Sequence, residues 1–168
     1  DDPTRVVSTD TPSRRSDAGT AWGTLIHALL EHAMRQKSAS REDLRRLAMW
    51  LTMEEPQLRP AIDTALDTVE AVARASFWEE AKASDERHEE VPFARSIAVE
   101  GSLQVMSGTI DLVYKRASDW RLLDYKTDSG ATTDDLRARY QQQIDVYAEA
   151  WGRVAGGDVA AELVSTRK

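Results

Sequence analysis

The chain has 168 residues, 41% of them hydrophobic and 30% charged, a composition typical of a globular protein with one core. No apolar run reaches the roughly 20 residues that a membrane-spanning helix needs, and no signal peptide begins the sequence, so we expect no membrane partner. Cysteine is absent, which excludes disulfides, iron–sulfur clusters and thiolate chemistry. A net charge of −7 argues against a domain that holds nucleic acid by its electrostatic field alone, but leaves nucleic acid open as a substrate.

The distribution of apolar residues predicts one folded domain over residues 19–168. Residues 1–18 are rich in Pro, Ser and Asp and lack periodicity, so we expect an exposed lead-in. Helical spacing of apolar residues then predicts three helices, over residues 20–37, 40–53 and 60–83. Runs of β-branched and aliphatic residues predict four strands, over 91–99, 103–114, 120–125 and 159–164, with a helix capped at Thr132/Thr133 and ended by Gly156 before the last strand. The fold class is therefore α/β, with one mixed sheet flanked by helices.

Two of these predicted strands each carry one carboxylate in an apolar setting. If residues 116–119 form the connecting loop, Asp111 lies directly opposite Asp124, with Cβ atoms roughly 4.5–5.5 Å apart, and Lys126 lies on the same face. Opposed like charges are unfavourable unless a hard divalent cation such as Mg²⁺ or Mn²⁺ binds between them. The alternative is an edge hairpin with both aspartates in solvent and Lys126 as their ion-pair partner. A shift of one residue would place the aspartates on opposite faces.

Two further polar residues have both a structural and a functional interpretation. His27 lies away from the apolar side of its helix, in a stripe with Gly19 and Gly23, where glycine permits close approach of a ligand or backbone. It is either a site residue or a partly exposed surface histidine. Gln143 lies inside the apolar stripe of the last helix, so its amide either bonds within the core or points at a functional site.

Five motifs occur in a characteristic order along the chain. They are GTLIH at 23–27, EVPF at 90–93, GTID at 108–111, DYKT at 124–127 and YQQQIDVY at 140–147. Together they resemble the RecB-type nuclease domain, a branch of the PD-(D/E)xK superfamily found at the C-terminus of AddA and RecB helicase–nucleases. The resemblance runs from about Gly19 to Thr166. It implies a restriction-endonuclease-like core of helix, three-strand meander, helix and strand, here with extra N-terminal helices.

The resemblance also implies a role for each matching residue. The metal ligands would be the side chains of His27, Asp111 and Asp124 and the backbone carbonyl of Tyr125. Lys126 would be the catalytic lysine, acting with the two aspartates. Tyr140 and Gln143 would line the site near the DNA strand, Tyr147 would pack beside them, and Glu90 would have a supporting role.

The function expected from this resemblance is hydrolysis of DNA phosphodiester bonds with Mg²⁺, for which Mn²⁺ would substitute, and without an iron–sulfur cluster. The chain would be the exonuclease part of a larger ATP-dependent helicase–nuclease that processes DNA double-strand ends for recombinational repair in the bacterial cytoplasm. Because the sequence has no Walker A motif, the motor domains that deliver single strands would lie outside it, as would any partner subunit. The alternative is a catalytically inactive nuclease-fold module that binds DNA or acts as a scaffold.

Overall fold

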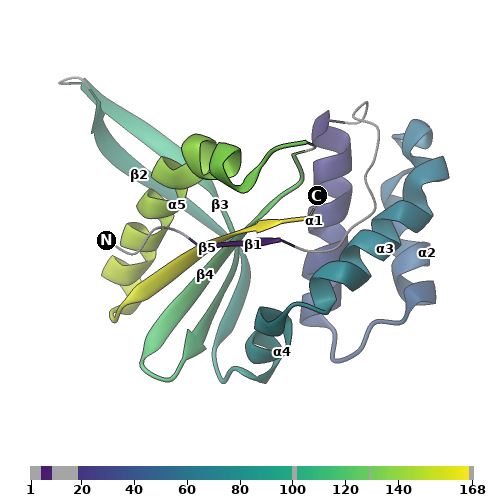
Figure 1. Cartoon of the computed structure of the whole chain (residues 1–168), viewed down its shortest axis with the longest axis horizontal. Coiled ribbons are helices and arrows are strands. Elements are labelled where there is room, and N and C mark those ends of the chain that lie inside the picture. Colours follow the sequence, from purple (N-terminus) through teal and green to yellow (C-terminus); the bar gives the residue numbers. More distant parts are fainter. Residues whose placement is uncertain (1–4, 9–18, 100–101, 129, 167–168) are drawn as a thin grey trace.

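The computed structural model describes residues 5–8, 19–99, 102–128 and 130–166, which form one sheet with helices on both faces (Figure 1). The strands are β1 (Arg5–Ser8), β2 (Arg87–Val99), β3 (Ser102–Arg116), β4 (Asp119–Lys126) and β5 (Val159–Ser165). The helices are α1 (Gly19–Arg35), α2 (Arg41–Leu51), the 3-10 helix η1 (Pro56–Ala61), α3 (Ile62–Ala73), α4 (Ser76–Ala83) and α5 (Thr133–Ala155). No helix in these ranges is long and apolar enough to cross a membrane.

The sheet is mixed, with the strand order β1-β5-β4-β3-β2. Strands β2, β3 and β4 form the predicted antiparallel meander, and β5 pairs parallel to β4 after the crossover through α5. This arrangement, preceded by the helices α1 to α4, confirms the predicted α/β fold of restriction-endonuclease type.

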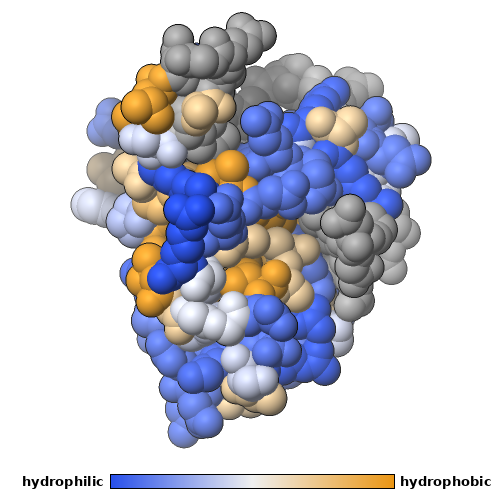
Figure 2. All heavy atoms as spheres, turned by 90° about the vertical axis from the view of Figure 1, so that its left-hand side faces the viewer, coloured by the Kyte–Doolittle hydropathy of each residue, from blue (hydrophilic) through white to orange (hydrophobic). Residues whose placement is uncertain are grey.

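Each face of the sheet has its own hydrophobic core. Helices α1 to α4 cover one face, where residues such as Ile26 and Leu66 pack against Leu112 and Leu123 of the sheet. Helix α5 covers the other face and packs Ile144 among the strand residues there. The molecular surface on the α5 side is mostly hydrophilic with separate hydrophobic patches (Figure 2). The sheet is thus held between two layers.

Two helices begin at capping boxes that the sequence carries. Ser40 Oγ accepts a hydrogen bond from the backbone N–H of Asp43 at 3.1 Å, and the Asp43 carboxylate accepts one in return from the Ser40 N–H. Thr132 and Asp135 form the same reciprocal pair at the start of α5. Because both pairs satisfy backbone donors that a helix end leaves open, they fix where α2 and α5 begin.

Two predicted segments differ from the structure. Within the expected lead-in, residues 5–8 instead form β1 and pair parallel with β5. This pairing joins segments far apart in the sequence, so the four residues of β1 alone do not predict it. The rest of residues 1–18 lies outside the described residues. The helix predicted over 60–83 is interrupted at Ala75, whose backbone is extended, so that a separate helix α4 can bury both Phe77 and Trp78.

The β3–β4 hairpin keeps the predicted register with a shorter loop. The loop was expected over residues 116–119, but Arg116 pairs with Asp119, so only two residues connect the strands. The register of the hairpin is unchanged, because Lys115 still lies opposite Trp120. The position of every residue further along the hairpin is therefore the predicted one.

The α5 core should contribute strongly to stability. Ile144 is fully buried, so Ile144→Ala should lower the free energy of unfolding by about 2–5 kcal/mol. Val154 on the same helix is 84% exposed, and Val154→Ala should change it by less than about 0.5 kcal/mol. Urea denaturation of both variants measures the difference. Equal effects would contradict the packing of α5 on the sheet.

Candidate metal and catalytic site

Three carboxylates lie side by side on neighbouring strands at the point where β3 and β4 separate. The β3–β4 ladder runs as far as Leu112 opposite Leu123, and Asp111 and Asp124 are the next positions along the two strands, with their carboxylates close enough to interact. Glu90 is level with Asp111 on β2, between two paired positions of the β2–β3 ladder. Asp111 and Asp124 are buried, and Glu90 is partly buried.

Asp111 replaces the backbone pairing that the diverging strands no longer make. Its Oδ2 accepts a hydrogen bond of 2.6 Å from the backbone N–H of Tyr125. Its Oδ1 lies 3.0 Å from Nδ1 of His27. The carboxylate therefore connects β3 to β4 and to α1, which fixes its position.

His27 reaches the site from α1, on the helix stripe that the sequence singled out. Its Nε2 lies 3.0 Å from the backbone carbonyl oxygen of Tyr125. A Cβ on Gly23 would lie 3.1 Å from Thr127 Oγ1, so the glycine permits the close approach of α1 to the segment after β4. His27 therefore belongs to this cluster, and its side chain is still 31% exposed.

Both ring nitrogens of His27 face acceptors, which favours the doubly protonated ring in the absence of another cation. Burial lowers the pKa of His27, but the hydrogen bond and the charge of Asp111 outweigh it and raise the pKa above its ordinary value. A cation between these oxygen atoms would offset the same negative charge.

The remaining carboxylates hold unfavourable negative charge. Burial, followed by repulsion from Asp111, raises the pKa of Glu90 to about 7. The same two causes raise the pKa of Asp124, although Lys126 opposes them. Glu90 also has a φ of +51°, a strained value for a residue with a side chain. Shifted carboxylates and backbone strain in one cluster are typical of a functional site.

The donor set fits a divalent cation. His27, Glu90 and Asp111 each offer a ligand atom within 4.8 Å of the others. The carbonyl oxygen of Tyr125 contacts His27, and Asp124 lies opposite Asp111. Carboxylate and carbonyl oxygens with one imidazole suit Mg²⁺ or Mn²⁺. Glu90, which the sequence analysis gave only a supporting role, is thus placed as a candidate ligand, and its half-buried position opposite Asp111 required the register of β2.

Lys126 is held on three sides beside these carboxylates. Its Nζ lies 2.7 Å from Asp124 Oδ2, donates a hydrogen bond of 3.1 Å to Gln143 Oε1, and lies 4.0 Å from the centre of the Tyr140 ring. Gln143 in turn donates to Tyr147 Oη at 2.9 Å. Tyr140 and Gln143 therefore contact the lysine, and the Gln143 amide also bonds to the core residue Tyr147.

A family model of the "PD-(D/E)XK nuclease superfamily" matches residues 5–168. The chain belongs to the PD-(D/E)XK nuclease superfamily. It is 30% identical to an ATP-dependent helicase/nuclease subunit of Anoxybacillus flavithermus over 138 residues, which cover 76% of this chain and 11% of that protein. The corresponding protein from Clostridium botulinum, strain Langeland, is 24% identical over 160 residues, covering 82% and 12%. The chain thus spans about a tenth of the length of these curated relatives.

Among solved structures, the crystal structure of protein VC1899 from Vibrio cholerae is 15% identical, with a TM-score of 0.36 over 89% of this chain and 42% of that chain. This similarity is too low to add to the assignment. The fold, the site geometry and the family match agree on a nuclease domain of this superfamily.

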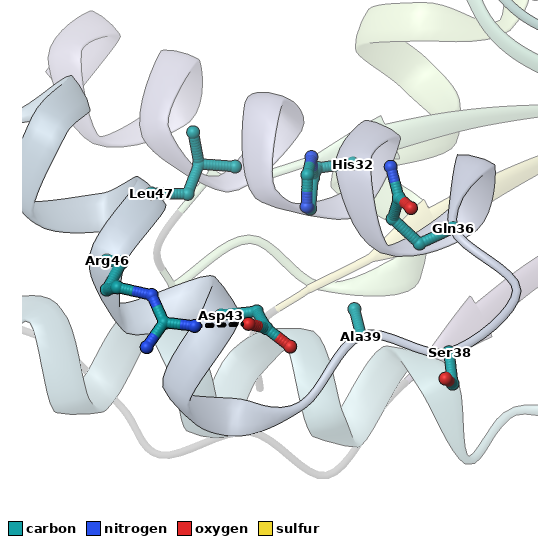
Figure 3. A pocket seen from close by; sticks show the side chains of 7 residues that line it. All are labelled: His32, Gln36, Ser38, Ala39, Asp43, Arg46 and Leu47. Atoms are coloured by element: carbon teal, nitrogen blue, oxygen red, sulfur yellow. Dashed lines mark hydrogen bonds and ion pairs between the residues drawn. The ribbon is translucent and has the colours of Figure 1, made fainter.

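Apart from the nuclease site, a polar pocket of about 410 Å³ lies where α1 ends and α2 begins (Figure 3). His32, Gln36 and Arg46 are among its lining residues, and Arg46 is paired there with Asp43. None of the candidate nuclease residues lines this pocket.

The raised pKa of Glu90 predicts a stability cost in the metal-free protein. An acid whose pKa rises from 4.5 to about 7 on folding destabilises the fold above its unfolded-state pKa, and the penalty is complete above about pH 7. Glu90→Gln should therefore raise the Tm at pH 8, by about 2–4 °C for each kcal/mol of unfolding free energy that the ionised carboxylate had cost. At pH 4 the substitution should have little effect. Calorimetry with EDTA present measures this shift. The exposed control Glu54→Gln should leave Tm unchanged at both pH values, and a lower Tm of Glu90→Gln at pH 8 would contradict the expectation.

Proposed function

We propose that this domain is a divalent-metal-dependent deoxyribonuclease, the nuclease part of a larger helicase–nuclease. The observation that carries the proposal is the convergence of Asp111, Asp124 and Lys126 on neighbouring strands, with His27 brought to them by α1. A purely structural domain has no need of buried, opposed carboxylates, which cost folding free energy.

The metal would be held by His27, Asp111, Asp124 and the backbone carbonyl of Tyr125, with Glu90 within reach. When bound, a divalent cation acidifies water and polarises a phosphate group. Asp111 would hold its geometry through the Tyr125 N–H, so the ligands are positioned before substrate arrives. Mg²⁺ is the proposed physiological ion because the donors are mainly hard oxygen atoms.

Lys126 would stabilise the negative charge that develops on the phosphate during hydrolysis. Its ammonium group can orient the attacking water and donate hydrogen bonds to a non-bridging phosphate oxygen. Attack in line with the leaving 3′ oxygen forms a new P–O bond and breaks the P–O3′ bond. The attacking water gives up a proton to solvent and the 3′ oxygen takes one from solvent, which leaves a 3′-hydroxyl and a 5′-phosphate. Tyr140, which is partly exposed and whose ring centre lies 4.0 Å from Lys126 Nζ, would contact the DNA strand.

The proposed setting is a bacterial, cytoplasmic enzyme in which motor domains feed single-stranded DNA to this exonuclease during the repair of double-strand ends. The curated relatives that carry the words helicase and nuclease in their names support it, as does the short share of their length that matches. Residues 19–168 would be the nuclease domain of such a chain, and the motor domains and a partner subunit would lie outside it.

Cleavage of a labelled single-stranded oligonucleotide tests the proposal. The wild-type chain should cut with Mg²⁺ or Mn²⁺ and stop on addition of EDTA. Asp124→Ala and Lys126→Ala should each lower the rate at least about 100-fold, because the first removes a proposed metal ligand and the second removes the ammonium group at the reacting phosphate. Asp119→Ala and Lys115→Ala, exposed positions at the far end of the same hairpin, are matched controls and should retain activity.

Calorimetric titration with Mn²⁺ separates the metal site from catalysis. The wild-type chain should bind Mn²⁺ stoichiometrically, and Asp111→Ala should weaken binding at least about 10-fold because a buried anionic ligand is lost. Binding without cleavage would favour the inactive nuclease-fold module. If the wild-type chain neither binds Mn²⁺ nor cleaves DNA, the proposed function is overturned.

A further inference from the structure

The hydroxyl group of Tyr147 occupies the space that a side chain at position 108 would fill. Gly108 on β3 pairs with Phe93 on β2, and a Cβ on Gly108 would overlap Tyr147 Oη. The same Cβ would lie 3.0 Å from Phe93 Cε1. The rings of Phe93 and Tyr147 meet edge to face with their centres 4.6 Å apart, so the tyrosine is fixed by both strands.

This fixed hydroxyl begins a hydrogen-bonded chain that ends at the ammonium group of Lys126. Lysine can only donate, so the Gln143 group that faces Lys126 Nζ at 3.1 Å must be its carbonyl oxygen. The amide nitrogen of Gln143 then faces Tyr147 Oη at 2.9 Å, and the hydroxyl accepts that hydrogen bond. The orientation of Gln143 is thus determined at both ends.

We propose that Tyr147 and Gly108 are positioning residues for Lys126, acting through Gln143. The resemblance by itself implies that Tyr147 lines the site and packs beside Tyr140 and Gln143. The proposal rests on the proposed function, in which Lys126 acts on the phosphate. Because β2, β3 and α5 meet at Tyr147, the chain connects the packing of these three elements to the position of one ammonium group.

The hydrogen bonds from Tyr147 through Gln143 matter because several groups contact Lys126 from different sides. Asp124 attracts the ammonium group strongly at 2.7 Å, towards the carboxylates. Gln143 and the Tyr140 ring contact the same group from α5. If Tyr147 no longer orients Gln143, the amide can turn away. Lys126, which is already paired with Asp124, then loses the contact from Gln143, and its ammonium group is no longer held in the position that faces the phosphate.

A double-mutant cycle on nuclease activity tests the proposal. Tyr147→Phe keeps the ring but removes the hydroxyl, and should lower kcat about tenfold, with the KM for DNA and the Kd for Mn²⁺ within about twofold of wild type. Gly108→Ala should lower kcat at least as much, because the methyl group displaces the hydroxyl. The double variant should fall little below Tyr147→Phe, since the most severe overlap, the one with Tyr147 Oη, is already gone.

Tyr114→Phe is the matched control. It also removes a hydroxyl of a buried tyrosine, one that donates to Glu80 at 3.1 Å away from the site, and should leave kcat unchanged. A wild-type kcat for Tyr147→Phe, or costs of the two single variants that simply add, would overturn the proposal and leave Tyr147 as a packing residue.

A second measurement does not depend on activity. In protein labelled with ¹⁵N-lysine, the Lys126 ammonium signal, assigned with Lys126→Met, should be protected from exchange in the wild type and lose protection in Tyr147→Phe but not in Tyr114→Phe. If the protein shows this result but cuts no DNA, the hydrogen-bonded chain from Tyr147 to Lys126 is supported and the proposed function is refuted. Equal protection in all three proteins would refute the positioning chain.

Discussion

The site depends on an excess of oxygen acceptors at the point where two strands of the sheet separate. Beyond the last paired position of β3 and β4, Asp111 accepts from the Tyr125 N–H and His27 lies against the Tyr125 carbonyl. The side chains therefore take the place of backbone pairing, and they bring negative charge with them. Helix α1 can supply His27 at this point only because Gly23 lets it lie close to the chain after β4. Sheet divergence, helix packing and charge are thus parts of one arrangement.

The cost of this arrangement is visible in the ionisation of the carboxylates. Burial and mutual repulsion raise the pKa values of Glu90 and Asp124, and Glu90 also adopts a strained backbone conformation. Neither feature stabilises the fold, since uncharged residues at these positions would avoid the repulsion and a glycine at position 90 would relieve the positive φ. Natural sequences keep such features where activity requires them. The unfavourable electrostatics are therefore evidence for a function that the compact two-layer packing alone does not need.

Local sequence signals predicted the elements whose cause is local. The capping pair of Ser40 and Asp43, and strand alternation around Asp111, depend on near neighbours, so the start of α2 and the hairpin register were predictable. The strand β1 depends on pairing with β5, far along the chain, and the interruption at Ala75 depends on how two aromatic rings are buried. Neither cause can be read from nearby residues. Family motifs identified the candidate residues, but only the register of β2 placed Glu90 beside Asp111.

Two residues of β3 at the candidate site illustrate what nearby sequence alone does not reveal. Gly108 and Asp111 are three positions apart, yet they interact with different layers of the molecule. Asp111 contacts His27 from α1. The space beside Gly108, where another residue would have a side chain, is filled by Tyr147 from α5. One strand therefore sets both the carboxylate cluster and, through Gln143, the ammonium group that faces it. A glycine in a strand carries no chemistry of its own, and its part in the site follows only from what fills the space that it leaves.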